Sequence, residues 1–141
     1  MIRFNNDYNH GAHPEILEAL SAVNDNSFGG YGEDEWCEKA ADLIRERVHC
    51  PDAAIHFFPG ATQANFIVIA SALSSVQSVI AADTGHINCH EAASVENTNH
   101  KIQTIPNTDG KITATQIDAC AGAYYEENEP EYYTEPKMVY L

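Results

Sequence analysis

Basic residues are scarce in this sequence. Its 141 residues include 7 Lys and Arg against 21 Asp and Glu, which gives a formal net charge of −14. Nucleic-acid and anionic-membrane surfaces need clustered Lys and Arg, so the charge balance argues against both classes of partner. It leaves open a local anion site made from backbone N–H groups, because such a site needs no net positive charge.

Paired cysteines and long apolar runs are also missing. The four cysteines (Cys37, Cys50, Cys89, Cys120) form no CxxC pair, the N-terminal MIRFNND has no apolar signal region, and no apolar run approaches the length of a membrane span. These absences predict a reduced, soluble, cytoplasmic protein. Hydrophobic residues still make up 44% of the chain, enough for a real core in a chain of one-domain length.

Several motifs of catalysis and nucleotide binding are absent as well. The sequence has no GxxxxGK[ST], no GxGxxG and no GxSxG. The run HINCHE at 86–91 is neither HExxH nor HxxEH, and no second cluster of ligands at a fitting spacing completes it. His10 and His13 are similarly isolated, so we expect no metal site.

What the sequence does contain is an alternation of helical and strand patterns. We expect helices from Pro14 to about 24, from 33 to 48, and over 62–74, 88–95 and 113–124, with strands over 53–58, 78–82, 101–105 and 138–141. A turn at 107–110 and an acidic loop at 126–136 separate the later elements. This order predicts an α/β fold with a largely parallel sheet and flanking helices. Because the chain stops inside an apolar strand, we expect it to be a piece of a longer protein.

The stretch HFFPGATQANF, residues 56–66, joins the first predicted strand to a helix through small residues. Gly60 and Ala61 would let an anion approach the backbone amides at the helix start, and the Thr62 hydroxyl would add a hydrogen bond. Taken alone, however, the local pattern favours an ordinary tight turn over an anion site.

Two further residues lie in loops where a ligand can reach them. His86 follows the strand 78–82, and ligands of open α/β sheets gather beyond the carboxyl ends of strands, so His86 and the 59–62 turn should lie at the same edge. An imidazole there can stack on a cofactor ring, bind a metal or transfer a proton; the alternative is a histidine in water. Tyr31 lies between Gly30 and Gly32 in a glycine-rich loop, where it reaches a ligand, a second subunit or only solvent.

Four motifs together resemble one enzyme family. RFNNDYNHGAHPEIL, GGYGEDE, FFPGATQANF and ADTGHINCHEAAS occur in the order and spacing of the low-specificity L-threonine aldolases, which belong to the β-eliminating-lyase branch of fold-type I pyridoxal-phosphate enzymes. The resemblance implies that Gly60, Ala61 and Thr62 hold the cofactor phosphate. It implies that His86 stacks on the pyridine ring near the substrate hydroxyl. Asn6 stands where the family has a serine that helps to hold the substrate carboxylate, and Tyr31 matches a tyrosine that contributes across the subunit interface.

The implied reaction is cleavage of a β-hydroxy-α-amino acid, such as threonine or allo-threonine, to glycine and an aldehyde. The family's Schiff-base lysine, pyridine-binding aspartate and substrate-binding arginines lie beyond position 141, and none of Lys39, Lys101, Lys111 and Lys137 is in the family's lysine context. We therefore predict that this chain is the N-terminal portion of such an enzyme, inactive alone, and a homodimer or homotetramer when complete.

The resemblance also suggests a functional division of the chain. Residues 1–32 would form an N-terminal arm, helix and glycine-rich loop, and 33–141 part of the cofactor-binding domain. Two alternatives stay open: a different fold-type I enzyme, either a β-eliminating lyase or an aminotransferase, and a non-catalytic domain that binds a phosphorylated ligand.

Overall fold

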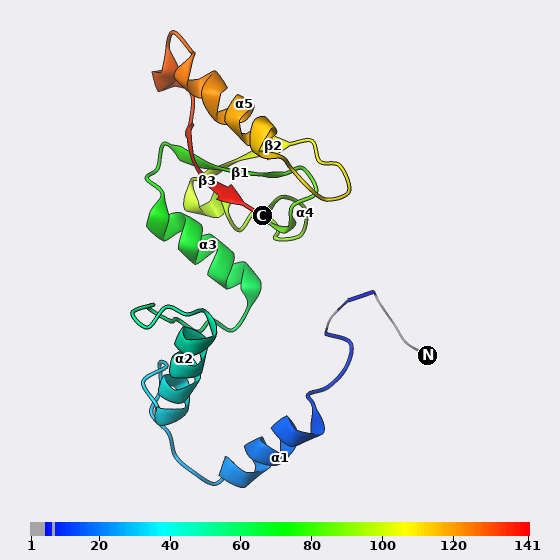
Figure 1. Ribbon diagram of the computed structural model, residues 1–141, viewed down its shortest axis with the longest axis vertical. Helices are drawn as coiled ribbons and strands as arrows, with labels where there is room; N and C mark the ends of the chain where they lie inside the picture. The colour runs from blue at the N-terminus through cyan, green and yellow to red at the C-terminus, as the bar shows by residue number, and fades with distance from the viewer. Residues whose placement is uncertain (1–4, 7) are drawn as a thin grey trace. The chain divides into compact units, whose positions relative to one another are not determined.

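Two compact units make up the chain (Figure 1). The computed structural model describes residues 5, 6 and 8–141. An N-terminal unit spans Met1–Phe57 and a C-terminal unit spans Phe58–Leu141. The functional division at 32/33 stays a prediction.

The N-terminal unit contains two helices, α1 (Pro14–Val23) and α2 (Glu35–Arg47), and both were predicted. Pro14 occupies the first turn of α1, where its missing N–H costs nothing. Asp34 caps α2, because its carboxylate accepts from the backbone N–H groups of Trp36 (2.9 Å) and Cys37 (3.0 Å). Acidic residues in the first turn of α2 and arginines in the last complement the helix dipole.

The strand predicted over 53–58 is wrong. These residues have no regular secondary structure, and Phe57 and Phe58 are 47% and 38% exposed. A strand is stable only when a neighbouring strand satisfies its N–H and C=O groups. Every strand of the described sheet comes from residues 77–140, and none of them pairs with this segment. The apolar character of this segment is therefore not sufficient to make it a strand.

A three-stranded parallel sheet forms the centre of the C-terminal unit, in the order β2-β1-β3. Its elements are α3 (Ala61–Ala72), β1 (Gln77–Ala82), α4 (His86–Cys89), η1 (Glu96–Thr98), β2 (Lys101–Ile105), α5 (Ala114–Tyr125), η2 (Pro130–Tyr132) and β3 (Glu135–Tyr140). Ala82 pairs with Ile105, and Ala81 pairs with Tyr140, so the carboxyl ends of all three strands meet at one edge. The predicted parallel α/β fold is confirmed.

Helices cover both faces of this sheet, with α3 and α5 on opposite sides in Figure 1. Side chains alternate along β1: Val79 and Ala81 join the core with Ile69 and Leu73 of α3, while Ser78 and Ile80 point to the other face. Thr113 and Gln116 form a capping box that starts α5. In the part of the chain that the structure describes, no helix is both long and apolar enough to cross a membrane.

The helix predicted over 88–95 is also wrong. Regular α-helix begins earlier, at His86, and ends at Cys89. Ala92 and Ala93 then adopt φ values of 47° and 63°, in the left-handed region that interrupts a right-handed helix. This break allows the Glu91 side chain to point into the unit, where it is buried.

Candidate functional site

A tight turn at the carboxyl end of β1 presents His86. The Gly85 N–H donates to the Ala82 carbonyl at 2.8 Å, and a Cβ atom on Gly85 would lie 2.9 Å from that same oxygen. Only glycine fits this approach without a backbone shift. Asp83, the first residue of the turn, accepts from the backbone N–H and side-chain amide of Asn107, and these hydrogen bonds lower the pKa of its carboxyl. The turn is therefore joined to the loop that follows β2.

A buried carboxylate holds the His86 ring. Glu91 Oε1 lies 2.8 Å from His86 Nδ1 and 2.5 Å from Asn65 Nδ2, and Glu91 Oε2 accepts from the Ser94 hydroxyl at 2.7 Å. The Glu91 side chain is fully buried, whereas the His86 side chain is 52% exposed. One side of the imidazole is thus anchored inside the unit while the rest of the ring remains open to a ligand.

The surroundings of Glu91 favour its ionised form. Burial by itself raises the pKa of this carboxyl, but the hydrogen bonds from Ser94, Asn65 and His86 outweigh burial and bring the pKa below its usual 4.5. Glu91 is therefore a carboxylate at neutral pH and can only accept hydrogen bonds.

The N-terminus of α3 offers free backbone donors. Gly60 is the N-cap in an extended conformation (φ −162°), no side chain caps the helix, and no acidic residue lies in its first turn. Gly60, Ala61 and Thr62 are exposed. The first N–H groups of a helix have no intrahelical partner and carry positive partial charge, so this end suits an anion such as a phosphate.

Asn65 connects this helix end to His86. It lies on α3 one turn beyond the N-terminus, and its amide donates to Glu91 and to the Tyr140 hydroxyl (3.3 Å). From the sequence, the 59–62 turn and His86 were expected at one edge of the sheet because each was predicted to follow a strand. The first of those strands does not exist, and the link instead runs from Asn65 through Glu91 to the imidazole.

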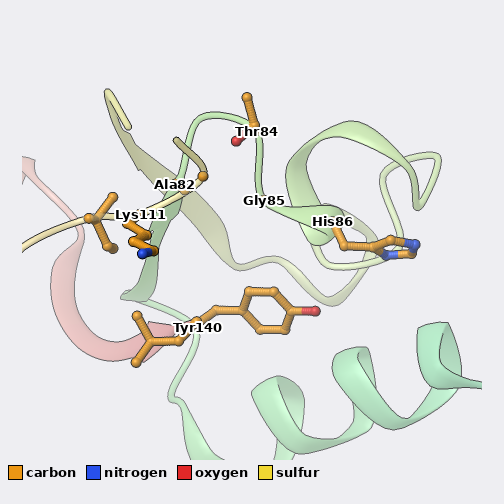
Figure 2. Close-up of a pocket in the computed structure, with 9 residues that line it drawn as sticks. Ala82, Thr84, Gly85, His86, Lys111 and Tyr140 are labelled. Carbon is orange, nitrogen blue, oxygen red and sulfur yellow. The ribbon is translucent and has the colours of Figure 1, made fainter. Parts of the chain in front are cut away.

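A cavity of about 470 Å³ lies at the carboxyl edge of β1 and β3 (Figure 2). Its lining includes Gly85, His86, Lys111 and Tyr140, and the phenol of Tyr140 points toward the His86 side of the cavity. Sequence reasoning placed neither Lys111 nor Tyr140 here, because both come from segments distant from His86 in sequence. Lys39 and Lys137, by contrast, form ion pairs with Glu35 and Glu135.

The predicted substrate residues Asn6 and Tyr31 belong to the N-terminal unit. The Asn6 side chain accepts from the Tyr8 N–H at 3.2 Å. Tyr31 is fully exposed and adopts φ 64°, and Gly32 follows at φ 80°, so the loop bends sharply and presents the phenol to solvent. A tyrosine held in the left-handed region is strained, and such strain is common where a residue meets a ligand. The roles of both residues stay predictions.

Metal ligands do not gather in the described residues: no group of three or more His, Cys, Asp and Glu side chains is placed to hold an ion. Within the HINCHE run, His86 and His90 lie with their ring centroids 5.6 Å apart, and Glu91 faces His86 as a hydrogen-bond partner.

Comparison with known proteins identifies the family. The sequence model of the beta-eliminating lyases matches residues 7–141. The chain belongs to the beta-eliminating lyase family. It is 28% identical over 139 residues to the low-specificity L-threonine aldolase of a Pseudomonas species, covering 97% of this chain and 39% of that enzyme. The corresponding enzyme of Pseudomonas aeruginosa is 27% identical over 141 residues, with 99% and 39% covered.

A solved structure gives the same result. The threonine aldolase of Leishmania major superimposes with a TM-score of 0.90 at 41% sequence identity, over 96% of this chain and 39% of that one. This likeness confirms the predicted membership of the pyridoxal-phosphate fold. The chain spans about 39% of the length of each of these relatives.

Pyridoxal phosphate is the cofactor of this family, and the observed residues fit it. The uncapped, exposed N-terminus of α3 suits the phosphate group. The anchored, half-exposed imidazole of His86 suits the face of an aromatic ring. The two are linked through a single buried carboxylate, Glu91.

Proposed function

We propose that the complete protein is a pyridoxal-phosphate-dependent aldolase, which cleaves β-hydroxy-α-amino acids such as threonine or allo-threonine to glycine and an aldehyde. The observation that supports it best is the 0.90 TM-score to a threonine aldolase, joined with the two-part site on α3 and α4. When bound, the cofactor supplies an electron sink for the carbanion left by carbon–carbon cleavage.

Each part of the site has a defined task in this proposal. The backbone N–H groups of Ala61 and Thr62 and the Thr62 hydroxyl bind the phosphate, with Gly60 giving close access. His86 lies against the pyridine ring and contacts the hydroxyl proton of the substrate. Asn6 helps to bind the substrate carboxylate, and Tyr31 contributes to the site across the subunit interface. The complete enzyme is a cytoplasmic homodimer or homotetramer that takes part in glycine and threonine metabolism.

The 141 residues alone are proposed to bind the cofactor without turning over substrate. Two observations support this: the chain spans only 39% of the length of these relatives, and none of its lysines lies in the family's sequence context. Lys111 is the lysine to examine, because it lines the same cavity as His86. Reduction with borohydride in the presence of cofactor should give no stoichiometric adduct on one lysine. A stoichiometric adduct that disappears in Lys111→Ala, together with aldehyde release from threonine, would overturn this part of the proposal.

A second candidate reaction is β-elimination, the reaction for which the beta-eliminating lyase family is named. It would require a leaving group on the β carbon in place of a hydroxyl. Assaying threonine, allo-threonine, tryptophan and cysteine with the complete enzyme separates the two reactions. Aldehyde with glycine indicates aldol cleavage, whereas ammonia with a 2-oxo acid (pyruvate from tryptophan or cysteine, 2-oxobutanoate from the threonines) indicates elimination.

The phosphate site can be tested on this chain directly. Ala61→Asp places a carboxylate in the first turn of α3, where it stabilises the helix but repels a bound phosphate. We expect about tenfold weaker binding of pyridoxal 5′-phosphate, equivalent to about 1.4 kcal/mol. Binding of pyridoxal, which has no phosphate, should not change.

The matched control is Ala72→Asp at the other, exposed end of the same helix. It adds the same charge and should leave pyridoxal 5′-phosphate affinity unchanged. Equal affinities for pyridoxal 5′-phosphate in the two variants would contradict a phosphate site at the N-terminus of α3.

A further inference from the structure

Glu91 is the most completely buried acidic side chain near the candidate site, and the proposed chemistry does not use it. Its side chain has no solvent exposure, and both of its oxygens accept hydrogen bonds, from Asn65, His86 and Ser94. Burial of a carboxylate is costly unless such donors compensate for the lost water. The chain nevertheless keeps this group beside a residue expected to touch the ligand.

The arrangement determines which nitrogen of His86 carries the proton. An ionised carboxylate is an acceptor only, so the 2.8 Å contact requires that Nδ1 donates an N–H to Glu91 Oε1. In the neutral imidazole, the other nitrogen, Nε2, then has no proton and is a hydrogen-bond acceptor. A histidine side chain free in water favours the opposite tautomer, with the proton on Nε2.

We propose that Glu91 is a positioning residue, which holds His86 as the Nδ1–H tautomer so that Nε2 accepts the proton of a substrate hydroxyl. The tautomer itself follows from the geometry of this chain; the hydroxyl as its target rests on the function proposed above. In that step the O–H bond breaks, its electron pair remains on oxygen and the proton moves to Nε2, giving an imidazolium whose charge Glu91 balances.

Asn65 and Ser94 make this positioning rigid. Ser94 binds the Glu91 oxygen that His86 does not use, which fixes the plane of the carboxylate. Asn65 binds the same oxygen as His86 and also the Tyr140 hydroxyl. The imidazole is therefore held relative to both α3 and the end of β3. The other ring near it, His90, lies at a centroid distance of 5.6 Å.

The test is nuclear magnetic resonance of the ¹⁵N-labelled 141-residue chain at alkaline pH, where the imidazole is neutral. Long-range ¹H–¹⁵N correlations identify the protonated ring nitrogen, with His86 assigned by comparison with His86→Asn. We expect Nδ1–H in the wild type. Glu91→Leu removes the acceptor and should return the ring to Nε2–H. Glu91→Gln keeps an acceptor oxygen without the charge, and should retain Nδ1–H.

The control is Glu96→Leu, because Glu96 is an exposed carboxylate in the same segment. It should leave the His86 tautomer unchanged. An Nε2–H signal for His86 in the wild type would overturn the proposal even if Glu91→Leu failed to fold, and so would an Nδ1–H signal that persists in folded Glu91→Leu. The measurement uses neither cofactor nor substrate, so a chain that did not bind pyridoxal phosphate would contradict the proposed function and leave this result intact.

Discussion

Replacement of Glu91 by leucine should destabilise the C-terminal unit by about 2 kcal/mol. The change removes the shared acceptor of three hydrogen bonds, each to a charged group and each contributing about 1.5–3 kcal/mol. Much of this hydrogen-bonding free energy is recovered in the variant through other partners. His86 is half-exposed and can turn to water, and Asn65 keeps the Tyr140 hydroxyl as a partner. About one such bond is therefore lost without replacement.

The assay must report the C-terminal unit alone, because the single tryptophan, Trp36, lies in the N-terminal unit. Hydrogen exchange of the buried β1 amides, at Val79 to Ala81, measures the free energy of opening the sheet. The matched substitution is Glu96→Leu, which alters an exposed carboxylate and should change the opening free energy by less than about 0.5 kcal/mol. Equal opening free energies in the two variants would refute the reasoning that the Glu91 network stabilises the unit.

Two other predictions concern pH and the turn at Gly85. Since folding lowers the pKa of Glu91 below 4.5, its contribution to stability is present above pH 4.5 and is lost as the pH falls through the folded-state pKa. In urea titrations of the C-terminal unit, the free energy of unfolding should therefore fall less at acid pH in Glu91→Gln than in the wild type. Parallel pH dependences of the two unfolding free energies would contradict this. Gly85→Ala should cost about 1–3 kcal/mol and disturb the His86 signals, because its Cβ would lie 2.9 Å from the Ala82 carbonyl oxygen. Gly60→Ala meets nothing within 4 Å and should fold normally; similar losses in both glycine variants would show that the close contact is not the cause.

The elements that sequence reasoning predicted well are those whose signals are local. Pro14 and the apolar spacing after it mark α1, and the start of α5 is fixed by the Thr113 capping box. β1 contains a short apolar run and β2 is a short segment rich in β-branched residues, and turn residues bound both. In such segments the residues that determine the structure are close neighbours in the chain, so a single sequence contains the necessary information.

The predictions that failed depended on partners elsewhere. The run at 53–58 is apolar enough for a strand, but no other strand of the described sheet pairs with it. The segment 88–95 has helical spacing, yet the helix ends at Cys89. Ala92 and Ala93 adopt left-handed backbone angles, and Glu91 reaches Asn65 of α3. Helical propensity is worth little against three hydrogen bonds to a buried carboxylate.

The same reason explains why part of the candidate site was missed. Gly60, Ala61, Thr62 and His86 could be proposed because their motifs are contiguous. Asn65, Glu91 and Tyr140 could not, because they meet only in the folded unit. The available hint was Asn65, a polar residue directly before the apolar run FIVIA of α3, where a partly buried amide usually has a specific partner.

We propose that this chain contains the phosphate site and the ring-stacking histidine of a pyridoxal-phosphate enzyme. The most direct test is to add pyridoxal 5′-phosphate to the ¹⁵N-labelled chain and to follow the backbone amides together with the histidine rings. We predict saturable shifts centred on the Ala61 and Thr62 amides and on the His86 ring, with pyridoxal shifting the ring but not the amides. Shifts that centre on other residues, or that do not saturate, would contradict both sites.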